Sequence, residues 1–185
     1  MKSEKEKCRC GELYDANHDP GLLSERRRCK RLCSEYNRLA QLCCEEADSI
    51  VRRLLGRTGE HFLIEPPFFC DYGYNIEIGE NFYANVNCVI LDGAEVRFGD
   101  NVFIGPNCAF YTAGHPLDAG QRRLGLEFAR PISVGSDVWF GGNVVVLPGV
   151  TIGDRCVIGA GSVVTRDIPA GCLAFGNPCR VIRKL

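Results

Sequence analysis

A chain of 185 residues is long enough for one substantial hydrophobic core with a small appendage, and short for two independent domains. Its 22 Lys and Arg stand against 23 Asp and Glu, and a formal net charge of -1 excludes a general attraction to nucleic acid or to an anionic membrane surface. We therefore expect one main body with no nucleic-acid or membrane partner, in which any phosphate binding is local.

The start of the chain bears on the compartment. Residues 1–14 read MKSEKEKCRCGELY, with charged residues where a secretory signal would place an apolar core. No stretch of roughly 18 or more apolar residues, the length of a transmembrane helix, occurs further along. These features favour a soluble, cytoplasmic protein.

Residues 1–57 are polar and charge-rich, and they carry the periodicity of helices. Ser24 is the expected N-cap of the first long helix, and Gly56 is the expected terminator of the second. The segment is too small to fold alone, so we expect it to pack on the rest of the chain. Its apolar residues at three- and four-residue spacing are Leu32, Cys33, Tyr36 and Leu39 in one run and Ile50, Val51, Leu54 and Leu55 in another.

A six-residue period replaces the helix pattern from Ile76 onward. Each hexad predicts one short strand and one corner, with an aliphatic side chain that points inward and stacks on its equivalent in the next coil. Three hexads would make one triangular coil, so a mainly β, coiled body is predicted. An early run has Phe82, Cys88 and Ala94 and, after a two-residue slip, Val96, Val102 and Cys108; the cleanest run has Ile132, Val138, Val144, Val150, Cys156, Ser162 and Ile168.

Twelve cysteines raise the question of a disulfide scaffold or a metal site. They occur without a repeated C-x-x-C pair, and only three His residues are available to join them. Cysteines such as Cys108 and Cys156 fall at aliphatic positions of the hexads, and no export signal is present. Reduced thiols that pack as small apolar side chains are therefore favoured over a metal. The cysteines are residues 8, 10, 29, 33, 43, 44, 70, 88, 108, 156, 172 and 179.

Motifs along nearly the whole chain resemble those of the hexapeptide acyltransferases, and in particular the maltose and galactoside O-acetyltransferase branch. The hexads alone are shared by many acyltransferases. The helical front with GELY at residues 11–14, together with the His-Pro loop at 114–116, narrows the resemblance to this branch. The other matching phrases lie at 65–67, 71–76, 81–85, 138–142, 148–154 and 176–180.

The resemblance implies a left-handed parallel β-helix over residues 58–185, with the helical segment 1–57 packed on the coil and on the acceptor site. It implies an acetyl-CoA-dependent O-acetyltransferase that acts on a hydroxyl of a sugar of the maltose, glucose or galactoside type and requires no metal. It also implies a homotrimer whose active sites lie between neighbouring subunits.

A non-repeating stretch at about 112–131 interrupts the hexads and contains His115. A hydroxyl is a poor nucleophile toward a thioester at neutral pH, and a positioned imidazole can remove its proton during the attack. His115 is therefore the expected general base, in line with the role that the family gives to the His of this phrase. A partner has to fix its tautomer, and Glu127 is the first candidate, with Asp118 or a backbone carbonyl as alternatives.

Acceptor and donor positions carry over from the same resemblance. Carboxylates and amides bond to several sugar hydroxyls, while an aromatic face covers the C–H surface of the ring. A glycine amide can stabilise an oxyanion, and arginines suit the phosphates of CoA. Acceptor-binding residues are expected at Asp15, Asp71, Asn85, Asp92 and Trp139, and acetyl-CoA-binding residues at Gly142, Ala160, Thr165, Arg166, Arg180 and Arg183.

Two other functions stay open and one is excluded. The same site chemistry serves acetyl transfer to a non-sugar acceptor, such as a xenobiotic or serine hydroxyl, and a coil that has lost its site would be a non-catalytic scaffold. A γ-type carbonic anhydrase needs three His ligands on the coil, where this chain offers His115 alone. At single positions, Asp15 is also typical of a helix cap, and Glu127 of a solvated loop charge.

Overall fold

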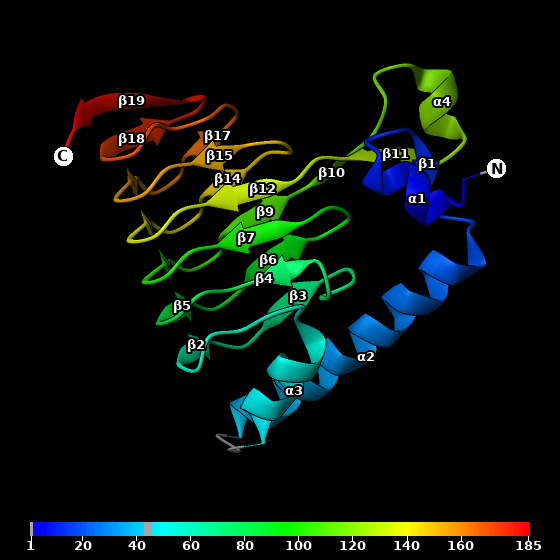
Figure 1. Cartoon of the computed structure of the whole chain (residues 1–185), viewed down its shortest axis with the longest axis horizontal. Helices are drawn as coiled ribbons and strands as arrows, with labels where there is room; N and C mark the ends of the chain where they lie inside the picture. Colours follow the sequence, from blue (N-terminus) through cyan, green and yellow to red (C-terminus); the bar gives the residue numbers. More distant parts are fainter. Residues whose placement is uncertain (1, 43–45) are drawn as a thin grey trace.

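Three parallel sheets form the sides of a triangular coil in the computed structural model, which describes residues 2–42 and 46–185 (Figure 1). Each coil contributes one short strand to each sheet, so neighbouring strands within a sheet come from successive coils. The first sheet contains β4 (Ile76–Glu77), β7 (Val96–Phe98), β12 (Ile132–Val134) and β15 (Thr151–Ile152). The second contains β2 (Phe62–Ile64), β5 (Phe82–Ala84), β8 (Phe103–Ile104), β13 (Trp139–Phe140), β16 (Val157–Ile158) and β18 (Cys172–Gly176). The third contains β3 (Phe68–Cys70), β6 (Cys88–Leu91), β9 (Ala109–Tyr111), β14 (Val145–Val146) and β17 (Val163–Val164).

The hexad positions face the interior, which confirms the predicted mainly β coil. The seven positions spaced by six from Ile132 to Ile168 are each at most 3% exposed. Ser162 is the polar member of this series, and its hydroxyl donates to the Gly159 carbonyl and accepts from the Gly176 amide, so its burial leaves no unpaired group. Cys108 and Cys156 are fully buried, as the core-thiol prediction required. Cys43 and Cys44 lie outside the described residues.

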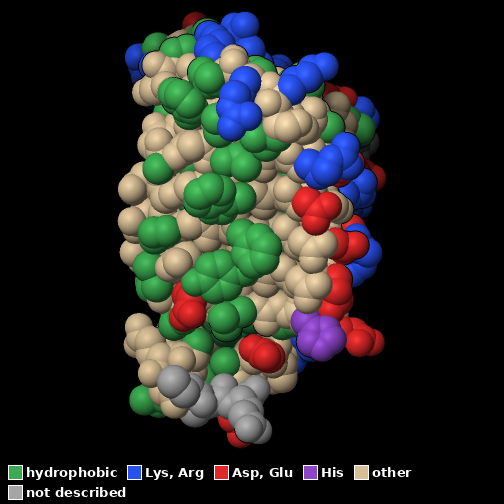
Figure 2. Space-filling view, turned by 90° about the vertical axis from the view of Figure 1, so that its left-hand side faces the viewer, with side chains coloured by type: hydrophobic (Ala, Val, Ile, Leu, Met, Phe, Trp, Pro, Cys, Tyr) green, Lys and Arg blue, Asp and Glu red, His purple; other side chains and the backbone are tan. Residues whose placement is uncertain are grey.

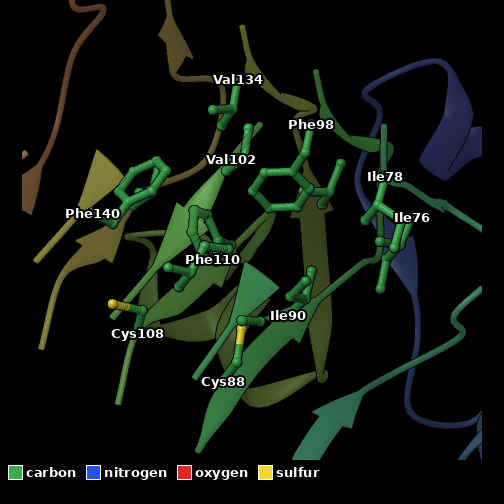
Figure 3. Packing of buried hydrophobic residues seen from close by; sticks show 14 of the residues in the cluster. Ile76, Ile78, Cys88, Ile90, Phe98, Val102, Cys108, Phe110, Val134 and Phe140 are labelled. Carbon is green, nitrogen blue, oxygen red and sulfur yellow. The ribbon is translucent and has the colours of Figure 1, made fainter. Parts of the chain in front are cut away.

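Aromatic side chains fill the centre of the coil. The rings of Phe98 and Phe110 meet edge to face with centroids 5.0 Å apart, and Phe110 meets Phe140 in the same way at 5.3 Å. Figure 3 shows these three rings between aliphatic residues and the thiols of Cys88 and Cys108. Edge-to-face pairs at such distances add to the free energy gained by burying apolar surface. The core is therefore continuous from one coil to the next.

The early hexad run contains one wrong position. Ala94 is only half-buried, and it packs on a separate small cluster rather than inside the coil. The inward position of the first sheet passes from Ile76 to Val96, 20 residues later, whereas Ser133 pairs with Thr151, 18 residues later. The two extra residues lie in the corner between Leu91 and Val96, so Ala94 is a residue of this corner and not an inward position.

Two helices cover the first end of the coil, α2 (Pro20–Gln41) and α3 (Ala47–Leu54). Most of their buried residues, including Tyr36 and Ile50, belong to the same apolar cluster as the coil interior, and Leu22 belongs to the separate small cluster. The expectation of Ser24 as N-cap is wrong, because the helix begins earlier. The Asp19 carboxylate accepts from the Leu22 amide at 2.8 Å and Pro20 occupies the first turn, a combination that fixes a helix start.

The N-terminus and the long loop join on one side of the coil. A three-stranded antiparallel sheet forms from β1 (Tyr14–Asp15), β11 (Leu126–Ala129) and β10 (Ala113–Gly114), with α1 (Glu4–Arg9) and α4 (Ala119–Arg123) beside it. Figure 1 shows these elements gathered at the side of the coil away from the C-terminus. The segment before α2 thus covers the loop that interrupts the hexads.

At the second end, β19 (Cys179–Lys184) turns back and pairs antiparallel with β18. This hairpin ends the stack of parallel strands (Figure 1). Its basic side chains lie exposed. Across residues 2–42 and 46–185, no helix is both long and apolar enough to cross a membrane.

Candidate active site

All inserted residues of the coil lie at one corner, between the third and the first sheet. In the first two coils, the strand of the first sheet begins eight residues after that of the third, from Phe68 to Ile76 and from Cys88 to Val96, instead of six. In the next coil the same corner expands into the loop that carries His115. Because parallel strands stack in register, these three insertions lie one above another. Asp71, Asp92 and the His115 loop therefore share one edge of the triangular coil.

Hydrogen bonds connect these stacked insertions. The amides of Asp71 and Tyr72 donate to Oδ1 of Asp92 at 2.9 and 2.8 Å. The Ala94 amide donates to the hydroxyl of Thr112 at 3.0 Å, and that hydroxyl donates to the Leu91 carbonyl at 2.6 Å. The edge is thus a connected polar network that leads to the start of the His115 loop, rather than three independent turns.

His115 follows β10 and is exposed, while Pro116 after it is buried. Its Nδ1 lies 3.0 Å from the carbonyl oxygen of Leu126 in β11. A proton on Nδ1 satisfies that carbonyl and leaves the lone pair of the neutral ring on Nε2. With this tautomer the exposed ring can accept a proton at Nε2.

Glu127 does not orient His115 in this geometry. Its carboxylate faces the hydroxyl of Tyr14 at 3.4 Å and the side-chain amide of Asn17 at 3.2 Å. Asp118, the second candidate, caps α4 by accepting from the Gln121 amide at 2.8 Å. The backbone carbonyl left open as an alternative is the group that contacts the ring, and the acidic side chains organise the loop around it.

Asp15 lies in β1 directly opposite Leu126 of β11. Its Oδ1 accepts from the amides of Asn17 and His18 at 3.1 and 3.0 Å, so the carboxylate shapes the turn that leads to α2. The helix cap itself is Asp19. Asp15 therefore pairs with the residue whose carbonyl contacts His115, a proximity that no periodicity in the sequence indicates.

Asp92 has no solvent-exposed surface, and its Oδ2 is the one buried side-chain oxygen without a partner in the described part of the chain. Burial raises the pKa of this carboxyl to about 7. Asp71, in contrast, is partly open and lines a cavity of about 620 Å³ together with Lys30 and Asn37; burial raises the pKa of its carboxyl as well. Asp71 thus presents its carboxyl group to the cavity, and Asp92 holds the turn of Asp71 and Tyr72 in place.

Asn85, Trp139 and Gly142 lie at a different edge, between the second and third sheets. They line one groove of about 420 Å³ together with Phe103 and Pro106. Trp139 is 55% exposed, and the Asn85 side-chain oxygen accepts from the Val86 amide at 2.8 Å. One chain therefore brings together only part of the predicted acceptor site, because the third sheet separates this groove from His115.

An apolar stripe runs down the second sheet beside this groove. The outward residues of successive strands stand in direct register, and Figure 2 shows apolar side chains along the middle of this face with Lys and Arg at its upper end. Such a contiguous exposed stripe is typical of a surface that another protein covers. The residues in register are Leu63, Tyr83, Phe103, Trp139, Val157 and Leu173.

The predicted donor residues lie toward the second end of the coil. A Cβ on Gly141 would come 2.6 Å from the Ala160 amide nitrogen, so this corner depends on a residue without a side chain. The Gly142 carbonyl accepts from the Gly161 amide of the next coil at 2.9 Å. The remaining predicted residues, Thr165, Arg166, Arg180 and Arg183, are exposed. Within residues 2–42 and 46–185, no ion pair engages these three arginines, which leaves their charge available to an anion.

The sequence reasoning did not identify Tyr14, Asn17, Thr112 and Leu126. Leu126 acts through its carbonyl, which any residue would supply, so no sequence signal could have found it. Tyr14 is part of the GELY phrase and is only 1% exposed. Its hydroxyl would lie 3.1 Å from a Cβ at position 93, so the absence of a side chain at Gly93 leaves room for it. Gly93 is therefore the residue from which the buried position of Tyr14 could have been predicted.

Two family models match the chain. The maltose acetyltransferase hexapeptide capping motif matches residues 7–59, and the bacterial transferase hexapeptide (six repeats) matches residues 131–166. The first match covers α2 and α3, and the second lies in the regular coils.

Similar proteins cover nearly the full chain. A putative acetyltransferase of Saccharomyces cerevisiae is 57% identical over 175 residues, which are 95% of this chain and 89% of that protein. The crystal structure of a maltose O-acetyltransferase from Clostridium difficile 630 has a TM-score of 0.96 at 48% identity and covers 100% of this chain and 98% of its own. A galactoside acetyltransferase in complex with coenzyme A has a TM-score of 0.94 at 43% identity and covers 100% and 92%.

Proposed function

The chain belongs to the left-handed β-helix acetyltransferases with hexapeptide repeats, in the maltose and galactoside O-acetyltransferase branch, and from this premise we propose that it transfers the acetyl group of acetyl-CoA to a hydroxyl of a sugar. The observation that supports this function best is the orientation of His115, whose Nδ1 faces the Leu126 carbonyl while the ring stays exposed. A base held in this way needs only an acceptor hydroxyl at Nε2.

The reaction proceeds by direct transfer. The acceptor oxygen attacks the carbonyl carbon of the thioester, and its proton moves to Nε2 of His115 as the C–O bond forms. The tetrahedral intermediate carries a negative oxygen, to which Gly142 offers its backbone amide. When the intermediate collapses, the C–S bond breaks and the imidazolium returns the proton to sulfur, giving an acetyl ester and CoA. Removing the base is expected to slow the step about 100-fold or more.

The acceptor site needs two edges of the coil. Asp71 lies at the edge of His115 and faces a cavity, whereas Asn85 and Trp139 lie at another edge. A homotrimer with sites between subunits unites them, because the groove of one chain then faces the His115 loop of its neighbour. The apolar stripe with Phe103 and Trp139 half-exposed supports such an interface. In this site Asp92 positions Asp71, and Asp15 supports the strand that holds His115.

The donor lies along the coil toward β19. The pantetheine arm extends past Ala160 and Thr165, and Arg166, Arg180 and Arg183 bind the phosphates. The absence of ion pairs at these arginines in the described residues supports a role in anion binding. The coenzyme A bound to the similar galactoside acetyltransferase supports the same donor class.

Release of the CoA thiol by the purified protein tests this function, measured over a panel of mono- and disaccharides with serine and chloramphenicol as non-sugar acceptors. Sugar-dependent release that requires His115 is the expected result. Release with serine or chloramphenicol only would assign a non-sugar acceptor. Binding of CoA without transfer to any acceptor would contradict the enzymatic proposal and favour a scaffold.

A further inference from the structure

Three thiols that are far apart in sequence converge where α2 packs on the coil. Cys29 and Cys33 lie on one face of α2, and Cys70 is the last residue of β3. The Sγ atoms of Cys29 and Cys70 are 3.5 Å apart, those of Cys33 and Cys70 are 3.7 Å apart, and all three lie within 4.8 Å of one another. All three residues are buried. In the described part of the chain this is the one group with such convergence of possible ligands.

The spacing of the sulfur atoms fits a metal better than a covalent bond. A tetrahedral zinc ion with Zn–S bonds of about 2.3 Å holds its sulfur ligands about 3.8 Å apart. A disulfide would require two of these atoms to approach to about 2.05 Å. The two short Sγ–Sγ distances already match the edges of a tetrahedral face. The third Sγ–Sγ distance is below 4.8 Å, so the helix and the strand hold three thiols close enough to surround one ion.

Space and charge around the cluster also suit an ion. The cavity of about 620 Å³ is lined by Cys33 and Cys70, and a second one of about 220 Å³ is lined by Cys29. These cavities give an ion a path to the buried thiols and leave room for a fourth ligand. Lys30 lines the larger cavity and balances the excess negative charge of three thiolates around a divalent cation.

We propose that Cys29, Cys33 and Cys70 form a site for one thiophilic divalent cation of the zinc class, with a water molecule from the larger cavity as fourth ligand. Binding deprotonates the three thiols and releases their protons to solvent. The ion links α2 to β3 and so fixes the N-terminal helices on the coil. Its role is structural and does not depend on acetyl transfer. The spacing of 29, 33 and 70 matches no repeated C-x-x-C pattern, and for this reason the sequence favoured apolar thiols alone.

Titration of the reduced, chelator-treated full chain with Cd²⁺ alone tests the proposal. Cd²⁺ bound to thiolates absorbs in the ultraviolet by charge transfer from sulfur, and one equivalent per chain is expected. Cys33→Ala is expected to weaken binding at least about 10-fold, because it removes a ligand and even supporting groups of metal sites contribute that much. Cys88→Ala is the matched control, since Cys88 is equally buried in the coil and lies outside the cluster. The exposed Cys10 is unchanged in both variants, so their difference isolates the cluster.

A second measurement needs no variant. Zn²⁺ that binds the folded state is expected to raise the Tm of the wild-type chain with increasing Zn²⁺ concentration, and Mg²⁺ at the same concentrations is expected to leave it unchanged. Equal Cd²⁺ affinity of wild type, Cys33→Ala and a second variant, Cys29→Ala, would overturn the proposal. So would a Tm that does not respond to Zn²⁺, or a disulfide between Cys29 and Cys70 found by mass spectrometry in the protein as isolated.

Discussion

The Asp71 amide donates a 2.9 Å hydrogen bond to the carboxylate of Asp92, one coil further along the β-helix. The same oxygen accepts from the Tyr72 amide, while the other oxygen of Asp92 is buried without a partner. One carboxyl group thus holds two stacked turns and contributes no exposed atom. In the proposed site, the geometry of Asp71 depends on a residue that a ligand cannot touch.

Asp92→Asn is expected to stabilise the protein increasingly as pH rises from 5 to 8. The folded-state pKa of about 7 lies above the usual value near 3.8, so the unfolded chain loses this proton first and wild-type stability falls between those two values. The shift corresponds to roughly 4 kcal/mol at most, of which about 2–3 kcal/mol develops from pH 5 to 8. Urea unfolding of both proteins at several pH values measures the difference. A difference that stays constant with pH would show that Asp92 does not titrate in this range.

His115→Ala is expected to lower kcat about 100-fold or more and to leave the KM for acetyl-CoA nearly unchanged, because it removes the base without altering the donor site. Steady-state rates of thiol release with the best acceptor measure both constants. His61→Ala is the matched control, since His61 is also exposed but interacts with Glu80 at the surface. Near-normal turnover of His115→Ala would rule out the assigned base.

Arg180→Ala and Arg183→Ala are expected to raise the KM for acetyl-CoA roughly 10-fold each, the effect of losing one hydrogen bond to a charged group. The KM for the sugar should stay within about twofold of the wild-type value, because these residues bind the donor and do not contact the acceptor. Arg97→Ala on the first sheet is the control, as Arg97 interacts with Glu77 and Glu95 instead. A selective loss of sugar affinity would contradict the placement of the donor.

Mixed trimers test whether sites are shared between subunits. His115→Ala and Asn85→Ala are each expected to be nearly inactive as pure proteins. Co-expressed in equal amounts, they are expected to recover ~25% of wild-type activity, because one site in four then combines an intact His115 with an intact Asn85 of the neighbour. No recovery in isolated mixed trimers would place both residues in a site within one chain.

Asp19→Ala is expected to destabilise the protein by about 1 kcal/mol, since Asp19 caps α2 through the Leu22 amide. Ser24→Ala serves as the comparison, and it should change the free energy of unfolding by less than about 0.5 kcal/mol because Ser24 lies inside the helix. Chemical denaturation of both variants decides between the two helix starts. A larger loss at Ser24 would favour the start predicted from the sequence.

The coil could be predicted because each hexad has one strict requirement, a small or aliphatic side chain that faces inward, and the pattern repeats. Ala94 could not be recognised as a corner residue, because it is small enough to be taken for an inward position of a hexad. The start of α2 was missed because Ser24-Glu25 and Asp19-Pro20 are both reasonable caps, and tertiary packing selects one. The separation of His115 from Asn85 follows from which corner carries each residue, which needs the register of all coils.

The partner of His115 and the thiol cluster are two features that the sequence does not predict. A carbonyl oxygen is common to all residues, so the sequence had no reason to favour Leu126 over the charged candidates. The approach of Cys70 to Cys29 and Cys33 depends on how a helix packs on the first coil, which the spacing of cysteines does not encode. In both cases the deciding fact is the docking of the N-terminal segment.

The two ends of the coil are closed by different means, and both prevent further molecules from adding along the coil axis. A stack of parallel coils presents open strand edges at each end, to which another molecule could add and begin a filament. At the first end, α2 and α3 cover the interior. At the second end, β19 runs antiparallel and carries Arg180, Arg183 and Lys184, whose like charges repel the same end of another molecule. Growth along the coil axis is blocked at both ends, and association is left to the sides.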